Sequence, residues 1–141
     1  MSEFPLDSRL EADSVLAAHY RQTAVRLMKT EPFFWVLLIP ERTGITEWHD
    51  LNSEETRELT FLIHHISKGI KLTENADKIN IGALGNIVPQ FHFHIIARAK
   101  NDTAWPGPVW GSGPFAPASD RIILERCERL RAILAEITAQ A

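Results

Sequence analysis

Cysteine is nearly absent from this chain, and its scarcity removes two classes of protein at once. Cys127 is the only cysteine among 141 residues, so one chain can form neither a disulfide framework nor a thiolate metal cluster. No apolar run approaches the length of a membrane helix, and the N-terminus lacks the charged, apolar and cleavage regions of a signal peptide. We therefore expect a cytoplasmic protein with no membrane partner.

An excess of positive charge is also lacking. The chain carries 15 Lys and Arg against 18 Asp and Glu, a net charge of −3, and has no basic block. Nucleic-acid-binding domains usually carry a clustered basic surface, so no large nucleic-acid interface is expected. Local binding of a phosphate by backbone amides remains compatible with a negative net charge.

Length and composition are those of an ordinary globular domain. The chain is 45% hydrophobic and 23% charged, and its length suffices to bury a hydrophobic core. We predict a single domain over residues 1–141, with its core at about 4–111 and a C-terminal helix at about 119–138.

One long helix is predicted in the middle of the chain. Asn52 is a favourable N-cap residue, and Glu55 follows three positions later, which is the capping-box pattern. Apolar residues then recur at three- and four-residue steps, so we expect a helix over about 53–71 with one face in the core. The C-terminal stretch repeats the same steps.

Several stretches favour β-structure. The segment 15–28 is ambiguous between helix and strand, and a strand is favoured from Thr23 onward. Residues 33–39 are almost continuously apolar, which is typical of a strand buried on both faces. Strands are also expected at 79–81 and 91–99. The pattern indicates an α+β fold, with an antiparallel meander of about five strands, one long helix and a C-terminal helix.

The stretch from Gln90 to Ile96 alternates between polar and apolar residues. With the two-residue period of a strand, one face carries three polar side chains: Gln90, His92 and His94. The other face carries three apolar side chains: Phe91, Phe93 and Ile95. Small residues at 82–86 let a backbone approach a ligand closely. The pattern favours a functional site and leaves its chemistry open between a nucleophile, an acid or base, and a metal ligand.

These residues also resemble a known family. Asn80-Ile81-Gly82, Gly85-Asn86 and Gln90-Phe91-His92-Phe93-His94-Ile95-Ile96 are similar to the histidine triad (HIT) signature, in which three histidines alternate with hydrophobic residues. Further stretches resemble the bacterial HIT-domain or diadenosine-tetraphosphate-hydrolase-like branch: 4–7, 35–40, 88–90 and 105–111. The chain departs from the signature at its first position, where Gln90 replaces a histidine.

The resemblance implies a HIT-like α+β fold, a homodimer and a hydrolase that attacks the α-phosphorus of a nucleotide conjugate. His92 would be the nucleophile that forms a nucleotidyl-histidine intermediate, and His94 would bind a phosphate oxygen. Asn80, Gly85 and Asn86 would contact phosphate or ribose. The expected substrates are dinucleoside polyphosphates or nucleoside phosphoramidates, and no cofactor is expected.

Gln90 is the third residue of the predicted catalytic set, and its side chain limits the proton transfer that the set can perform. A glutamine donates and accepts hydrogen bonds but transfers no proton near neutral pH. Two alternatives to a hydrolase therefore stay open, a nucleotidyltransferase and a non-catalytic nucleotide-binding protein. A metal site is not expected, because no histidine follows His94 and the next acid is Asp102.

The Gly- and Pro-rich stretch 103–117 contains two tryptophans, Trp105 and Trp110. Solvated linkers seldom carry such large apolar side chains. We predict that this loop packs over the site or against a partner subunit.

Overall fold

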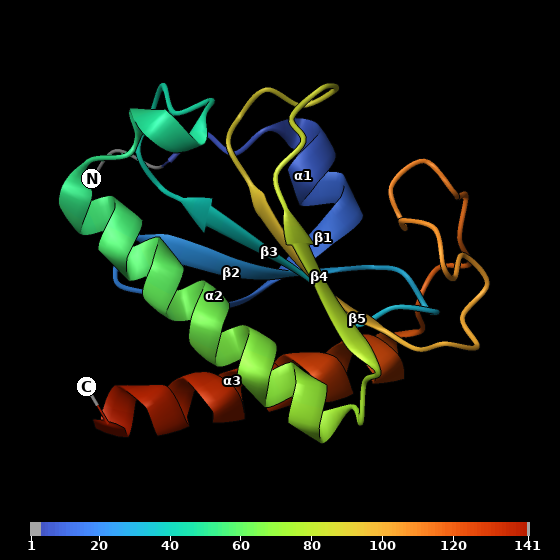
Figure 1. Ribbon diagram of the computed structural model, residues 1–141. Helices are drawn as coiled ribbons and strands as arrows, with labels where there is room; N and C mark the ends of the chain where they lie inside the picture. The colour runs from blue at the N-terminus through green and yellow to red at the C-terminus, as the bar shows by residue number, and fades with distance from the viewer. Residues whose placement is uncertain (1–3, 141) are drawn as a thin grey trace.

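The computed structural model describes the backbone of residues 4–140 and the side chains of residues 4–139, and it contains one five-stranded antiparallel sheet (Figure 1). The strands are β1 (Ser14–Tyr20), β2 (Thr23–Met28), β3 (Trp35–Pro40), β4 (Lys78–Gly82) and β5 (Phe93–Arg98). The helices are α1 (Ser8–Asp13), the 3-10 turn η1 (Trp48–Asp50), α2 (Ser53–Thr73) and α3 (Asp120–Gln140). The predicted α+β class, with about five antiparallel strands, a long helix and a C-terminal helix, is confirmed.

The strand order across the sheet is β1-β2-β3-β5-β4. The first three strands follow one another as a meander, and α2 then carries the chain across to the far edge. β4 forms that edge, and β5 returns between β4 and β3, antiparallel to both. His94 consequently sits between Leu37 of β3 and Gly82 of β4.

β1 shows why the segment 15–28 was ambiguous in the sequence. The strand begins at Ser14, well before Thr23, and its pairing with β2 shifts register between Leu16 and Ala18. This irregularity places the buried residues three apart, at Ser14, Ala17 and Tyr20. A bulge of this kind hides the two-residue period of a strand and imitates a helical pattern.

Both long helices begin at the caps that the sequence contains. The Asn52 side chain accepts a hydrogen bond from the Glu55 amide, and the Glu55 carboxylate accepts one from the Asn52 amide, at 2.8 and 2.9 Å. The Ser119 hydroxyl accepts a hydrogen bond from the Ile122 amide at the start of α3. Within residues 4–140, no helix combines the length and apolar character needed to cross a membrane.

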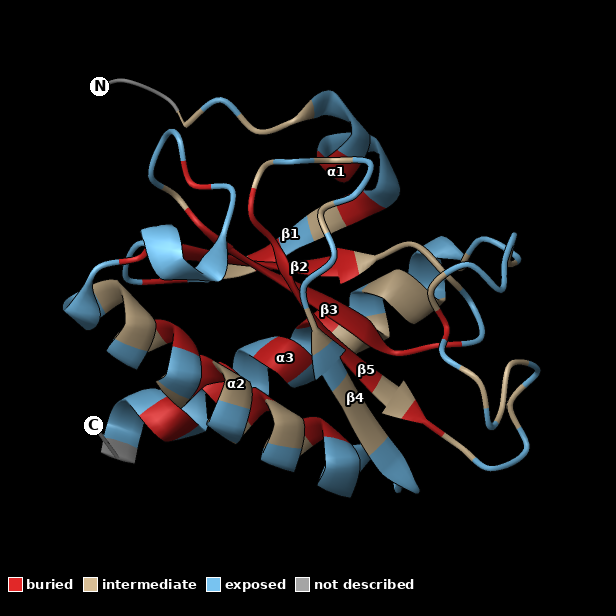
Figure 2. Cartoon of the chain, turned by 45° about the horizontal axis from the view of Figure 1, so that its top comes forward, coloured by how far each residue is buried: buried red, intermediate tan, exposed pale blue. Residues whose placement is uncertain are grey.

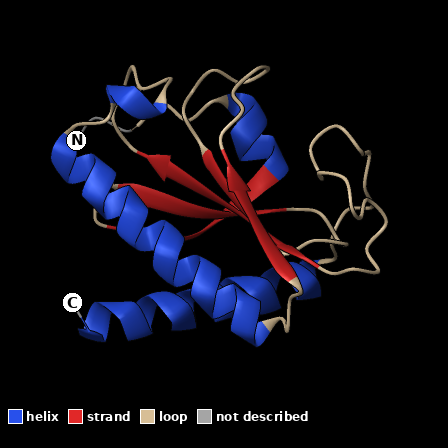
Figure 3. Ribbon diagram, viewed as in Figure 1, coloured by secondary structure: helices blue, strands red, loops and turns tan. Residues whose placement is uncertain are grey.

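The sheet separates two hydrophobic clusters, and Figure 2 shows that β2, β3 and β5 are buried between them. On β3, Val36 and Leu38 face α2 and α3, whereas Trp35 and Leu37 face the opposite side. Figure 3 shows that both long helices lie on one side of the sheet. The opposite side is covered by α1 and by loops, and it is the side on which His94 lies.

Candidate functional site

The two histidines of the predicted site lie side by side at the start of β5. Their ring centroids are 4.9 Å apart, and only 8% of His92 and 6% of His94 is exposed. Phe91, Phe93 and Ile95 belong to the core on the helix side, so the predicted alternation of faces is present. The regular strand begins at Phe93 and ends at Arg98, which is shorter than the predicted 91–99.

His92 is held by the main chain of Gln90. The Nδ1 atom of His92 lies 2.7 Å from the carbonyl oxygen of Gln90. A carbonyl oxygen only accepts hydrogen bonds, so Nδ1 carries the proton and donates it. The neutral imidazole then has its lone pair on Nε2, which is the tautomer that a nucleophilic histidine needs.

His94 has the opposite tautomer to His92: its Nδ1 accepts a hydrogen bond, and its Nε2 carries the proton. The indole Nε1 of Trp35 donates to Nδ1 of His94 at 2.9 Å, so the proton of the neutral ring is on Nε2. Burial lowers the pKa of His94 to about 3, and the nearby His92 adds to this effect. At neutral pH, His94 is therefore an uncharged donor through Nε2. No local pattern in the sequence indicates that Trp35 contacts His94, because the contact depends on the pairing of β3 with β5.

A cavity of about 790 Å³ opens beside the histidines on the face opposite the long helices. Four of the six predicted site residues line it together: Gly85, Asn86, His92 and His94. The other lining residues are mostly apolar: Asp13, Met28, Thr30, Trp35, Leu84, Ile87, Val88, Val109, Trp110, Gly111, Gly113, Pro114 and Phe115. Gly85 has a φ of +74°, a conformation that favours glycine and shapes the turn in this wall.

Asn80 and Gln90 do not line the cavity. The side-chain oxygen of Asn80 accepts a hydrogen bond from Nη1 of Arg98 at 2.8 Å. The Arg98 side chain is 1% exposed, pairs with Asp102 at 2.8 Å and donates to the Gly107 carbonyl. Asn80 therefore supports a buried network beneath the loop that follows β5. The side chain of Gln90 binds the N-terminal segment.

The loop with two tryptophans uses them differently. Trp110 lines the cavity, with its ring edge-on to His94 at a centroid distance of 5.4 Å. It also covers Gly82, where a Cβ atom would lie 3.4 Å from the indole. Trp105 instead lies against the guanidinium of Arg98, 5.5 Å from its ring centroid. Of the two, Trp110 is the one that packs over the predicted site.

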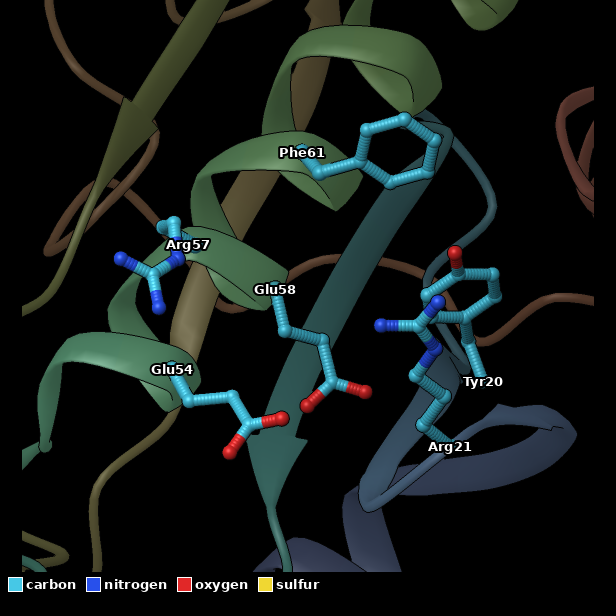
Figure 4. A pocket seen from close by; sticks show the side chains of 6 residues that line it. All are labelled: Tyr20, Arg21, Glu54, Arg57, Glu58 and Phe61. Carbon is cyan, nitrogen blue, oxygen red and sulfur yellow. The ribbon is translucent and has the colours of Figure 1, made fainter. Parts of the chain in front are cut away.

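A second hollow, of about 330 Å³, lies away from the histidines (Figure 4). Figure 4 shows Glu54 and Glu58 projecting from α2 beside Arg21. The lining residues are Tyr20, Arg21, Glu54, Arg57, Glu58 and Phe61. None of them is a histidine or a cysteine. Across the described part of the chain, no three His, Cys, Asp or Glu side chains are grouped as metal ligands.

Comparisons with known proteins agree with this fold. The family model described as HIT domain matches residues 9–101. A histidine triad protein from Sinorhizobium meliloti 1021 is 40% identical, with a TM-score of 0.88 over 92% of this chain and 96% of that one. Histidine triad proteins from Marinobacter aquaeolei VT8 and Bradyrhizobium japonicum are 37% and 36% identical, with TM-scores of 0.90 and 0.88. They align over 96% and 92% of this chain, and over 98% and 96% of their own. No curated protein matches the chain.

Proposed function

The chain belongs to the HIT domain family, and from that premise we propose that it is a nucleotide hydrolase that cleaves a nucleotide conjugate at the α-phosphorus. The observation that carries the proposal is the hydrogen bond from Nδ1 of His92 to the Gln90 carbonyl, at the wall of a cavity. This bond leaves the Nε2 lone pair of His92 free and holds the ring in place just before β5.

The proposed reaction has two displacements at phosphorus. Nε2 of His92 attacks the α-phosphorus, the bond from phosphorus to the leaving oxygen or nitrogen breaks, and a nucleotidyl-histidine forms. Water then attacks the same phosphorus and releases a proton to the solvent, the bond to Nε2 breaks, and a nucleoside monophosphate leaves. The leaving group takes its proton from water, because Gln90 has no proton to give near neutral pH.

Phosphate binding in this proposal relies on neutral donors. His94 offers Nε2–H, since its Nδ1 is occupied by Trp35 and its low pKa keeps it uncharged. Backbone amides of the turn at Gly85 and Asn86 are the further donors that we assign to the phosphate oxygens. Asn80 contributes indirectly through its hydrogen bond with Arg98.

The charges around the cavity favour a substrate with a single phosphate. Among the described residues that line the cavity there is no Lys or Arg, whereas Asp13 is present. Arg9 donates to the carbonyl of Ile87 in the cavity wall, but its charge is paired with Asp7 at 3.0 Å. A polyphosphate chain would bring several negative charges that nothing here neutralises. The apolar lining suits a leaving group with an apolar body.

A substrate panel tests this proposal. We expect metal-free turnover of nucleoside phosphoramidates with apolar amines, with kcat/KM at least about tenfold higher than for dinucleoside polyphosphates, a difference of about 1.4 kcal/mol. Added Mg²⁺, which neutralises phosphates, should narrow the gap. A higher kcat/KM for the polyphosphates without Mg²⁺ would contradict the charge argument. If AMP binds but no conjugate is cleaved, a non-catalytic nucleotide-binding protein remains.

We also propose that the protein acts as a homodimer. β4 is an edge strand in the sheet order, and its Ile81 is 51% exposed, a combination that favours pairing with another chain. Sedimentation should show a dimer for the wild type and a monomer for Ile81→Lys. A monomeric wild type would contradict the proposal. The cytoplasmic location stays a prediction.

A further inference from the structure

We propose that Gln90 is a positioning residue, whose side chain fastens the N-terminal segment to the chain just before β5 and thereby shapes the substrate cavity. This inference rests on the proposed function for its kinetic consequence. The geometry on which it stands is independent of that function. It also accounts for a glutamine at the position where the HIT signature has its first histidine.

The side-chain amide of Gln90 is paired with two backbone groups far away in the sequence. Its Oε1 accepts a hydrogen bond from the Asp7 amide at 2.9 Å, and its Nε2 donates to the Pro5 carbonyl at 3.0 Å. The two bonds engage both ends of the amide, as a neighbouring strand would. They turn the side chain toward the N-terminal segment, and Gln90 does not line the cavity.

The segment held by Gln90 leads directly to a wall of the cavity. The Asp7 carboxylate caps α1 by accepting from the Arg9 amide at 2.8 Å. Arg9 in turn donates to the Ile87 carbonyl at 3.1 Å, a second link to the loop before β5. α1 buries Leu10 against the loop-covered face and ends at Asp13, which lines the cavity. Loosening the N-terminal segment should therefore displace a substrate-binding wall.

The same residue reaches His92 by a different route. The Gln90 carbonyl orients the His92 ring, and that contact survives any change of the side chain. The side chain thus governs the position of α1, while the main chain governs the nucleophile. A substitution at Gln90 should accordingly change substrate binding much more than the chemical step.

Glutamine fits this task better than histidine does. The amide offers a donor and an acceptor at once, whatever the pH. A protonated imidazole has two donors and no acceptor. Its N–H would then point at the N–H of Asp7, and no hydrogen bond could form between them. With glutamine in place of histidine, the hydrogen bonds to the N-terminal segment are independent of pH. The position then lacks a group that can transfer protons.

The test is Gln90→Ala, with kinetics and hydrogen exchange measured on the full chain. We expect KM to rise about tenfold, as for the loss of about 1.4 kcal/mol of binding, while kcat changes less than about threefold. The backbone amides of Asp7 and Glu11, which donate to Gln90 and to the Asp7 carbonyl, should exchange faster. Amides of β4 provide the internal control and should be unaffected.

A matched pair of variants isolates the bond from the other side. Asp7→Ala and Asp7→Pro both remove the capping carboxylate, but only proline also removes the backbone N–H. We expect KM to rise more in Asp7→Pro than in Asp7→Ala. Combining Asp7→Pro with Gln90→Ala should raise KM little beyond either single change. If the two changes raised KM additively, the proposed hydrogen bond between Gln90 and the Asp7 amide would not be what positions the N-terminal segment.

The outcomes separate this inference from the proposed function. If the backbone amides of Asp7 and Glu11 exchanged at the wild-type rate in Gln90→Ala, Gln90 would not hold the N-terminal segment, whether or not the protein is an enzyme. If Gln90→Ala showed faster exchange, a large loss of kcat and an unchanged KM, Gln90 would not act through the cavity wall at Asp13. If no conjugate is turned over, the dissociation constant for AMP replaces KM, and it should rise about tenfold in Gln90→Ala.

Discussion

Replacing His92 with alanine should abolish turnover, with kcat falling on the order of 10⁴-fold or more. The nucleophile of the proposed reaction is then gone, and water must attack the substrate directly. The loss should be far larger than for any other single change in the cavity, because the two displacements both pass through Nε2 of this ring. Steady-state kinetics on the best substrate of the panel measures it.

His65→Ala is the matched control for His92→Ala. His65 lies on α2 and packs against Phe61, with ring centroids 4.4 Å apart, remote from the cavity lining. We expect its kcat to stay within about twofold of the wild type, since this half-buried side chain does not line the cavity. Both variants should bind AMP. Residual activity above about a tenth of the wild-type rate in His92→Ala would argue against a nucleophilic role.

Replacing Asp102 with asparagine should lower the free energy of unfolding by about 3–5 kcal/mol. Arg98 and Asp102 form a buried pair with side chains 1% and 7% exposed, and the change leaves the Arg98 charge without its partner. The Asp102 carboxylate also accepts hydrogen bonds from the amides of Ala99, Ala104 and Trp105. An asparagine cannot serve all these donors, because its NH₂ group is itself a donor.

The control for this pair is Glu125→Gln. Arg121 and Glu125 also stand four residues apart, but their side chains are 86% and 45% exposed. Exposed pairs contribute about 0–1 kcal/mol, so this variant should unfold almost as the wild type does. Urea denaturation of both variants decides the matter. Equal losses of unfolding free energy in the two variants would show that the buried pair stabilises the fold no more than the exposed pair does.

The Asp102 pair also sets the sign of a pH effect. The side-chain hydrogen bonds from Arg98, with further backbone hydrogen bonds, hold the pKa of Asp102 below its usual value. A carboxyl group with a lowered pKa stabilises the folded state above its unfolded pKa of about 3.9, and the contribution is lost as the pH falls further. The stability gap between wild type and Asp102→Asn should thus be full at pH 7. It should shrink only in acid below about pH 4.

This buried pair matters for the site because of what it anchors. Arg98 donates to the Gly107 carbonyl, just before Val109 and Trp110 reach the cavity. The loop after β5 is therefore fixed at its base by an ion pair and covers His94 at its tip. We expect Asp102→Asn to loosen Trp110 as well as to destabilise the fold.

Features that depend on local periodicity were predictable from the sequence. The alternation from Gln90 to Ile96 placed His92 and His94 on one face, and the capping box of Asn52 fixed the start of α2. The segment that forms β1 was ambiguous because its bulge replaces the two-residue period with a three-residue one. Local pattern reasoning has no means of detecting that irregularity.

Contacts between distant segments were not predictable. Gln90 pairs with Pro5 and Asp7 across 85 and 83 residues, and Trp35 donates to His94 across 59. Such pairings depend on strand order and on the path of a loop, and no spacing in the sequence encodes them. They also decide the roles: Trp35 fixes the His94 tautomer, and Gln90 faces away from the cavity.

The most direct test of a nucleotidyl-His92 intermediate is to trap it. The wild-type protein and its best substrate should be mixed, quenched in alkaline denaturant within milliseconds to seconds, and analysed by intact mass and peptide mapping. We predict a transient gain of one nucleoside-monophosphoryl group on the peptide that contains His92, formed at least as fast as kcat and absent from His92→Ala. Full turnover with no adduct on that peptide at any time would contradict covalent catalysis by His92.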